Sequence, residues 1–269
     1  FGHFNSVTGY WNNIVVLLTL SSLIIIGGIG FTVWFELYNY RGIKKLSVHS
    51  KVVIVVSVAL LIVGTILMFL FEMNNKKTIG DMGFGYKVLN SYFASASPRT
   101  AGMNSVSTDD MVNASKFLTV ILMFIGGSPG STAGGLKTST FGVIILSVIS
   151  VIRGREDAQV FGRRFSKELV YKSLALLIIG MSIVILVTMI LTITEPGESF
   201  INLLYEATSA FGTVGLTTGV TQRLSSVGKV VIILTMYCGR VGPMTVVLAL
   251  LKNKKKQTHK YPEGRILIG

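Results

Sequence analysis

Long uncharged runs constrain the fold of this chain more than any other feature. Three runs carry no charged residue over 20 to 22 positions, and they cover residues 14–35, 52–71 and 173–194. Each is long enough to cross a hydrocarbon core about 30 Å thick as a helix. A further run, 230–251, is interrupted only by Arg240, and residues 117–151 are apolar at both ends around a glycine-rich middle. We therefore expect an all-α polytopic membrane protein with five spans.

The composition agrees with a membrane protein and excludes two other classes. Only 14% of residues are charged, against roughly 25% in soluble domains, and 50% are hydrophobic. The formal charge of +13 lies in short segments between apolar runs, not on one face of a soluble domain, so we expect membrane lipid and no nucleic acid as a partner. Cys238 is the single cysteine, which excludes an internal disulfide.

The distribution of lysine and arginine predicts the orientation of the spans. Sixteen lie in residues 37–51, 152–172 and 252–269, and seven lie in residues 72–116 and 195–229. Cytoplasmic loops carry the excess of positive charge, so we place the sixteen in the cytoplasm. The chain is then a multi-pass protein of the plasma membrane with a cytoplasmic C-terminus.

The two outer segments resemble one another. Each contains a stretch of about eleven residues, 86–96 and 200–210, which is too short to span and suits a re-entrant half-helix. A shift of 113 positions places Tyr92 on Tyr205, and "TAGM" at 100–103 on "TVGL" at 213–216. The following spans match at the same shift, and a shift of 99 brings Gly27 and Gly28 onto Gly126 and Gly127. We infer an internal repeat of span, half-helix, Thr-x-Gly strand and span.

The repeat predicts how the chain divides. We expect the last span of a preceding, second unit with a cytoplasmic loop at 1–50, a third unit with a broken second span at 51–165, a fourth unit at 166–251 and a cytoplasmic tail at 252–269. The residues before position 5 match the stretch just after a Thr-x-Gly strand. We therefore expect this sequence to be N-terminally truncated.

A Thr-x-Gly strand after a half-helix needs a special explanation at membrane depth. Non-helical backbone is tolerated there only where it lines a water-filled cavity or is buried in protein. Potassium channels use a related run, in which carbonyl oxygens replace the hydration shell of the ion. Glycine permits the backbone angles that this requires, and the negative C-terminal end of the half-helix favours a cation.

Several motifs together resemble the Trk/Ktr/HKT superfamily of potassium transporters, and most closely the bacterial Ktr-type membrane subunits. They are "ASPRTAGMNS" at 96–105, "IGGSPGSTAGGLKTSTFG" at 125–142, "SAFGTVGLTTG" at 209–219, "GRVGPMT" at 239–245 and "YPEGRILIG" at 261–269. The resemblance implies span–pore-helix–span units of potassium-channel type with re-entrant filter loops. It also implies K⁺ bound by backbone carbonyls of Thr100, Ala101 and Gly102 in the third strand, and of Thr213, Val214 and Gly215 in the fourth.

The resemblance further implies partners and no cofactor besides the transported ion. The family forms homodimers and works with a soluble ring of nucleotide-binding subunits, for which the basic loops are the expected docking surface. Basic loops equally attract anionic lipid. The third strand departs from the channel pattern, because Ala101 and Met103 stand where a channel has valine and tyrosine. A less selective Na⁺/K⁺ channel and an ion-coupled symporter therefore remain alternatives to potassium uptake.

The stretch "GGSPGSTAGGLKTST" at 126–140 nearly spells a phosphate-binding loop. That loop needs Gly-x4-Gly-Lys-Ser/Thr after a strand, whereas Leu136 separates Gly135 from Lys137 here. We predict instead a break in the third span, which in the resembling family is an intramembrane loop that gates the pore. A purely structural kink is the alternative. The predicted gate comprises Gly126, Gly127, Ser128, Pro129, Gly130, Ser131, Thr132, Gly134, Gly135, Lys137 and Arg240.

Arg240 is the second unusual residue. A cation at mid-span costs at least about 2.5–3.5 kcal/mol and faces the protein interior. We expect it to project into the pore, raise the barrier to cations and hydrogen-bond loop carbonyls. A structural arginine at a helix end is the alternative. Lys137 either meets lipid headgroups or steadies the loop.

An enzyme is not expected. The histidines, His3, His49 and His259, lie outside the spans, and no aspartate or glutamate lies within a span core. General acid–base chemistry and metal binding therefore lack candidate residues. The same lack of an embedded carboxylate speaks against a coupled symporter in this portion.

Overall fold

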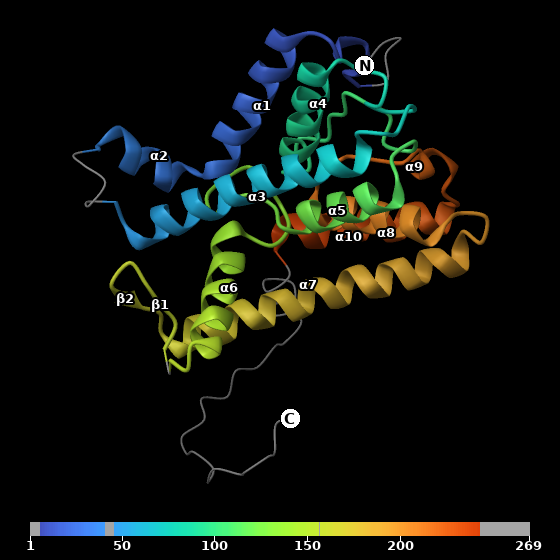
Figure 1. The fold of residues 1–269 in the computed structure, drawn as a ribbon. Helices are drawn as coiled ribbons and strands as arrows, with labels where there is room; N and C mark the ends of the chain where they lie inside the picture. The colour runs from blue at the N-terminus through green and yellow to red at the C-terminus, as the bar shows by residue number, and fades with distance from the viewer. Residues whose placement is uncertain (1–5, 41–45, 156, 243–269) are drawn as a thin grey trace.

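The computed structural model describes residues 6–40, 46–155 and 157–242, and these are almost entirely helical (Figure 1). The elements in chain order are the 3-10 turn η1 (Thr8–Tyr10), α1 (Ile14–Ile29), α2 (Phe31–Tyr38), α3 (Val48–Glu72), α4 (Phe84–Ala96), α5 (Asn113–Phe124), α6 (Thr138–Ile152), β1 (Gln159–Val160), β2 (Arg163–Arg164), α7 (Lys167–Thr194), α8 (Phe200–Gly212), α9 (Val220–Arg223) and α10 (Ser226–Val241). The predicted all-α membrane fold is confirmed.

Two of the expected spans are single helices. α3 has 25 residues and α7 has 28, and both are long and apolar enough to cross a membrane. Their N-termini are capped by Ser47 and Ser166, whose side chains accept hydrogen bonds from the amides of Ser50 and Leu169. Such caps satisfy amides that have no partner within the helix.

The expected span at 14–35 is a bent pair of helices, and the expectation of one continuous helix was wrong. α1 and α2 meet at a bend of 97°. Gly30 occupies the bend with φ 93° and ψ 147°, a conformation that side chains with a Cβ rarely adopt. The span at 230–251 is described only as far as α10 and Gly242, so its last part lies outside the described residues, as does the tail.

The two half-helices lie where the repeat predicted them, and their neighbours correspond. α4 packs on α3, the first span of its own unit, and on α1 before it. In the same way, α8 packs on α7, the first span of its own unit, and on α5, which belongs to the unit before it. Figure 1 shows α5, α8 and α10 lying between the long helices α3 and α7. The equivalent packing supports the proposed repeat.

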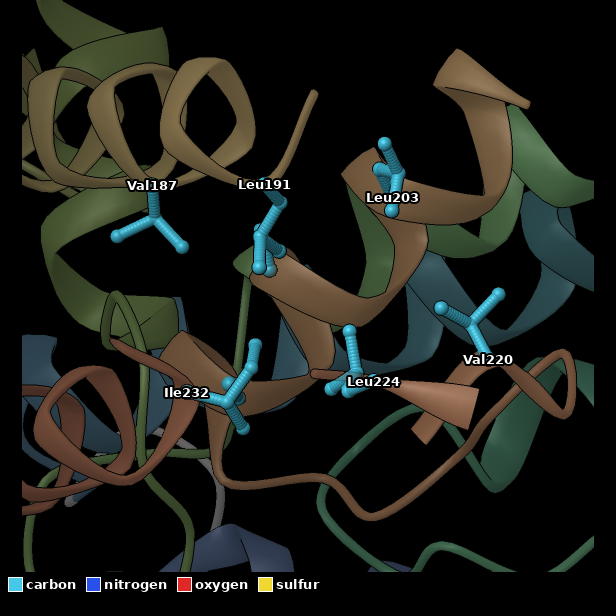
Figure 2. Packing of buried hydrophobic residues seen from close by; sticks show 8 residues of the cluster. Val187, Leu191, Leu203, Val220, Leu224 and Ile232 are labelled. Carbon is cyan, nitrogen blue, oxygen red and sulfur yellow. The ribbon is translucent and has the colours of Figure 1, made fainter. Parts of the chain in front are cut away.

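The fourth unit is held by a core that collects around α8. Leu203 and Ala207 of α8 meet Leu191 of α7, and the cluster continues to Leu224 and to Ile232 of α10 (Figure 2). Leu191 and Leu203 are fully buried. Helices in a membrane associate through van der Waals packing, so this close-packed cluster fixes the half-helix against the two spans that flank it.

A carboxylate, buried for Glu72 and half-buried for Glu195, joins the two spans at the same end of each unit. Glu72, the last residue of α3, accepts a hydrogen bond from the amide of Val112, the N-cap of α5, at 2.9 Å. Glu195, which follows α7, accepts one from the amide of Ser225, the N-cap of α10, at 3.1 Å. A negative charge at a helix N-terminus is stabilising. Sequence analysis missed both residues because they lie at span ends.

Candidate ion filter and gate

The two Thr-x-Gly strands lie against each other. A Cβ built on Gly102 would stand 2.4 Å from the carbonyl oxygen of Val214 and 3.2 Å from the Cα of Gly215. The backbones therefore touch at the positions that the 113-residue shift made equivalent. The structure thus brings the six predicted filter residues into one place, although they are separated by more than 100 positions in the sequence.

The backbone of the two strands shares an unusual conformation. Thr100 has φ 64° and Thr213 has φ 50°, and Gly102 and Gly215 follow with φ 67° and 92°. A β-branched residue in the left-handed region is an outlier, and such strain gathers at functional sites. The same strain at matched positions in two units indicates a shared geometric requirement.

Serine hydroxyls at the ends of the half-helices hold the strands. The Oγ of Ser97, just after α4, accepts a hydrogen bond from the amide of Met103 at 3.1 Å. The Oγ of Ser209, in the last turn of α8, accepts one from the amide of Gly215 at 3.2 Å. Both serines are buried. The strand backbone is therefore positioned by the helix that precedes it.

Glu206 is a site residue that sequence analysis missed. It lies in α8, is 4% exposed, and binds the segment that follows the fourth strand. Its carboxylate accepts hydrogen bonds from the hydroxyl of Thr217, from the amide of Thr218 at 3.3 Å and from the hydroxyl of Thr221 at 2.7 Å. The expectation that this portion holds no embedded carboxylate was therefore wrong, because it considered the spans and not the half-helices.

The glycine-rich segment between α5 and α6 lies directly against the base of the fourth strand. A Cβ on Gly134 would stand 2.3 Å from the Oγ1 of Thr213 and 2.9 Å from the carbonyl oxygen of Gly212. Gly135 comes almost as close, with Gly212 Cα at 3.4 Å. The predicted break in the third span is present, and only glycine fits these positions because backbone approaches backbone there.

The loop is also bound to the bend between α1 and α2. The amide of Ser128 donates to the carbonyl oxygen of Gly28 at 2.9 Å, and the amide of Phe31 donates to that of Gly130 at 3.1 Å. A Cβ on Gly30 would stand 2.4 Å from the carbonyl oxygen of Pro129. The bend and the loop therefore fit together through main-chain contacts.

Hydroxyl groups inside the loop bond to one another. The hydroxyl of Ser128, which is fully buried, lies 2.8 Å from that of Thr138. The hydroxyl of Ser131 donates to the carbonyl oxygen of Ser128 at 2.6 Å. The hydroxyl of Ser128 is therefore enclosed within the loop.

Two cations bind loop carbonyls. Arg240 of α10 donates from Nη1 to the carbonyl oxygen of Thr132, as predicted. Lys137 donates from Nζ to the carbonyl oxygen of Ala133, which favours the steadying role over contact with headgroups. All the predicted gate residues are thus gathered at a point where the loop meets α10, the fourth strand and the bend at Gly30.

An ion pair in the fourth unit joins the segments that precede and follow the half-helix α8. Arg223 of α9 forms two hydrogen bonds with Glu198, from Nε at 2.6 Å and from Nη2 at 3.1 Å. The hydrogen bond from Arg223 lowers the pKa of Glu198 below its ordinary value. The pair ties the segment before α8 to the segment after the fourth strand, so it brackets the half-helix at both ends.

Known proteins are similar in sequence to most of this chain. The "Potassium/sodium uptake protein NtpJ" of Enterococcus hirae is 42% identical over 262 residues, which is 96% of this chain and 58% of the relative. The "Ktr system potassium uptake protein B" of Bacillus subtilis is 37% identical over 98% of this chain and 59% of the relative. The chain thus spans less than two thirds of the length of these relatives.

A solved structure and a family model agree with these relatives. The crystal structure of the potassium transporter TrkH from Vibrio parahaemolyticus has a TM-score of 0.74, at 17% identity, and covers 93% of this chain and 55% of that chain. That likeness shows the fold. The model of the TrkH family, described as "Cation transport protein", matches residues 3–260. The chain therefore belongs to the TrkH family of cation transport proteins.

Proposed function

We propose that this chain forms part of a potassium uptake protein in which residues 100–102 and 213–215 bind the dehydrated ion with main-chain oxygens. The observation that carries the proposal is the contact of Gly102 with Val214 and Gly215. It joins two strands with the same left-handed threonine and glycine geometry, each at the end of a half-helix. The names of the two relatives described above, a potassium/sodium and a potassium uptake protein, support the same function.

The half-helices supply the electrostatic part of this mechanism. The C-terminal end of a helix carries roughly half a negative charge, and α4 and α8 both end at the strands. The hydroxyls of Ser97 and Ser209 accept hydrogen bonds from strand amides and so fix the strands, whose carbonyl oxygens can replace the water around an ion without reorganising. An ion that passes the filter next reaches the loop at Gly134.

The gate follows from the position of the loop. The segment 126–137 lies beneath the fourth strand and is joined to α10 by the hydrogen bond from Arg240 to Thr132. In this proposal the loop obstructs the path of the ion, and the path opens when the loop leaves Arg240 and the bend at Gly30. The glycines supply the backbone freedom for that movement.

A less selective conductor of Na⁺ and K⁺ is the second candidate function. The third strand has Ala101 and Met103 in place of the channel residues, and one relative is named for both ions. A coupled symporter is less well supported, because the carboxylate of Glu206 already accepts three hydrogen bonds from its own chain. Membership of a cation transport family places the chain among transporters and not among enzymes.

Sidedness and partners are part of the proposal. We place the basic loops and the C-terminus in the cytoplasm and the protein in the plasma membrane, on the positive-inside distribution of lysine and arginine. A homodimer that is regulated by a soluble nucleotide-binding ring follows from the family resemblance. The tail at 252–269 lies outside the described residues.

The test is ion uptake by cells that lack their own potassium transporters. The whole protein is expressed with Gly215→Ser and, as a control, with Gly197→Ser, since a Cβ at Gly197 meets nothing within 4 Å. Gly215 has φ 92°, so serine strains the fourth strand there. We expect loss of potassium uptake or of the preference among Na⁺, K⁺ and Rb⁺ in the first variant only. Normal uptake with unchanged preference would overturn the filter assignment.

A further inference from the structure

An apolar groove of about 360 Å³ lies between α3 and α6, away from the filter and the loop. Val55, Ala59 and Val63 line it from α3, spaced four residues apart and so on one face of that helix. Ile145 and Ile149 line it from α6 in the same way. These side chains are exposed on the described surface, and every residue that lines the groove is apolar.

A hairpin and a lysine close one end of the groove. Strands β1 and β2 are joined by Phe161 and Gly162, whose φ angles of 49° and 74° are those of a tight two-residue turn. Phe161 contributes to the groove lining and stays half-exposed. The Nζ of Lys51, in the first turn of α3, lies 5.5 Å from the centre of its ring. The groove thus ends at a cation that an aromatic ring holds in place.

This arrangement fits one ligand class better than its competitors. α3 is long enough to cross the membrane, so its middle faces hydrocarbon and its first turn lies at the level of the headgroups. A long apolar groove accepts an acyl chain, and an ammonium group at headgroup level attracts a phosphate. A helix of another protein would account for the apolar face but not for the lysine at its end.

We propose that the groove between α3 and α6 binds an acyl chain of an anionic phospholipid whose phosphate is held by Lys51. The exposed Arg163, paired with Val160 in the hairpin, adds positive charge close to this end. Binding at the groove is independent of ion conduction, so it can be tested apart from the filter and the gate.

Native mass spectrometry of the purified whole protein measures the lipid that stays bound. The probe is an equimolar mixture of phosphatidylglycerol and phosphatidylcholine with identical acyl chains. We expect the protein to retain phosphatidylglycerol in preference, and Lys51→Gln to reduce that preference about fivefold, since one lysine near the surface is worth about 1 kcal/mol. Lys172→Gln is the control, because Lys172 lies in the first turns of α7 and pairs with Glu168. An unchanged preference in Lys51→Gln would overturn the proposal.

A second variant tests the groove itself. Ala59→Phe fills the groove, whereas Val58→Phe places the same ring on a neighbouring exposed position that does not line it. We expect the first to lose both phospholipids and the second to retain them. Equal retention in both would show that only bulk lipid is bound, and a changed oligomer mass with unchanged lipid would assign the groove to a second copy. Either result would contradict the proposal.

Discussion

At the scale of single residues, Gly102 is the position where the two strands tolerate least change. A Cβ there would meet a carbonyl oxygen at 2.4 Å, and φ is 67°. We expect Gly102→Ala to abolish potassium uptake. The added methyl group would overlap a main-chain carbonyl oxygen, so the backbone of the fourth strand would have to move, and a side-chain rotation cannot relieve the overlap. Uptake assays should show Gly85→Ala to be normal, since a Cβ on Gly85 of α4 meets nothing within 4 Å. Normal uptake by Gly102→Ala would mean that the contact between the strands is not required.

Arg240 is the residue that links the loop to α10. Arg240→Gln removes the charge and weakens the hydrogen bond to Thr132, and a hydrogen bond from a charged group is worth about 1.5–3 kcal/mol. We expect potassium flux into proteoliposomes to rise at least about threefold, since both the barrier to cations and the hold on the loop decrease. Arg223→Gln, which breaks a pair far from the loop, is the control. Flux equal to that of the unaltered protein would assign Arg240 a structural role.

The filter residues show what sequence can and cannot predict at this scale. The repeat predicts which residues are equivalent, and the glycine requirement follows from backbone sterics. Nothing in the sequence predicts left-handed Thr100 and Thr213, because threonine normally avoids that region. Their conformation comes from tertiary contacts between strand, half-helix and loop. The contact between the two strands joins residues more than 100 positions apart, so no local pattern carries it.

At the scale of elements, Glu206 joins α8 to the segment after the fourth strand. Glu206→Ala leaves two threonine hydroxyls and the amide of Thr218 without their acceptor. We expect the thermal midpoint to fall by about 5 °C or more, and the preference for K⁺ over Na⁺ to decrease, since unpaired buried groups are costly. Glu206→Gln keeps an acceptor at Oε1 and should lose less. A selectivity change without any loss of stability would contradict this positioning role.

The spans show a second limit of sequence analysis. Hydropathy predicted α3, α7 and both half-helices well, because length and apolar content alone decide them. It failed at Gly30, where the apolar run continues through a 97° bend. Alignment of "GGIG" at 27–30 with "GGSP" at 126–129 carried the missing signal, since the loop breaks the helix at the equivalent place. The repeat was therefore more informative than hydropathy at this position.

At the scale of the whole molecule, the bend at Gly30 holds the loop through main-chain contacts. Gly30→Ala places a methyl group 2.4 Å from the carbonyl oxygen of Pro129 and strains a φ of 93°. We expect the loop to shift and potassium flux to rise. The double variant with Arg240→Gln should then show less than the product of the two single effects, because both changes release the same loop. Independent effects in the flux assay would show that the two contacts act separately.

The carboxylates of Glu72 and Glu195 have a consequence for where motion can occur. They fasten the starts of α5 and α10, so the second span of the third unit is anchored ahead of its glycine-rich break. In the proposed gating we therefore expect displacement on the cytoplasmic side of that break. A pore built in this way can close at its cytoplasmic end while the ion-coordinating strands keep their geometry. Selectivity among alkali metal ions is then the same after each closure.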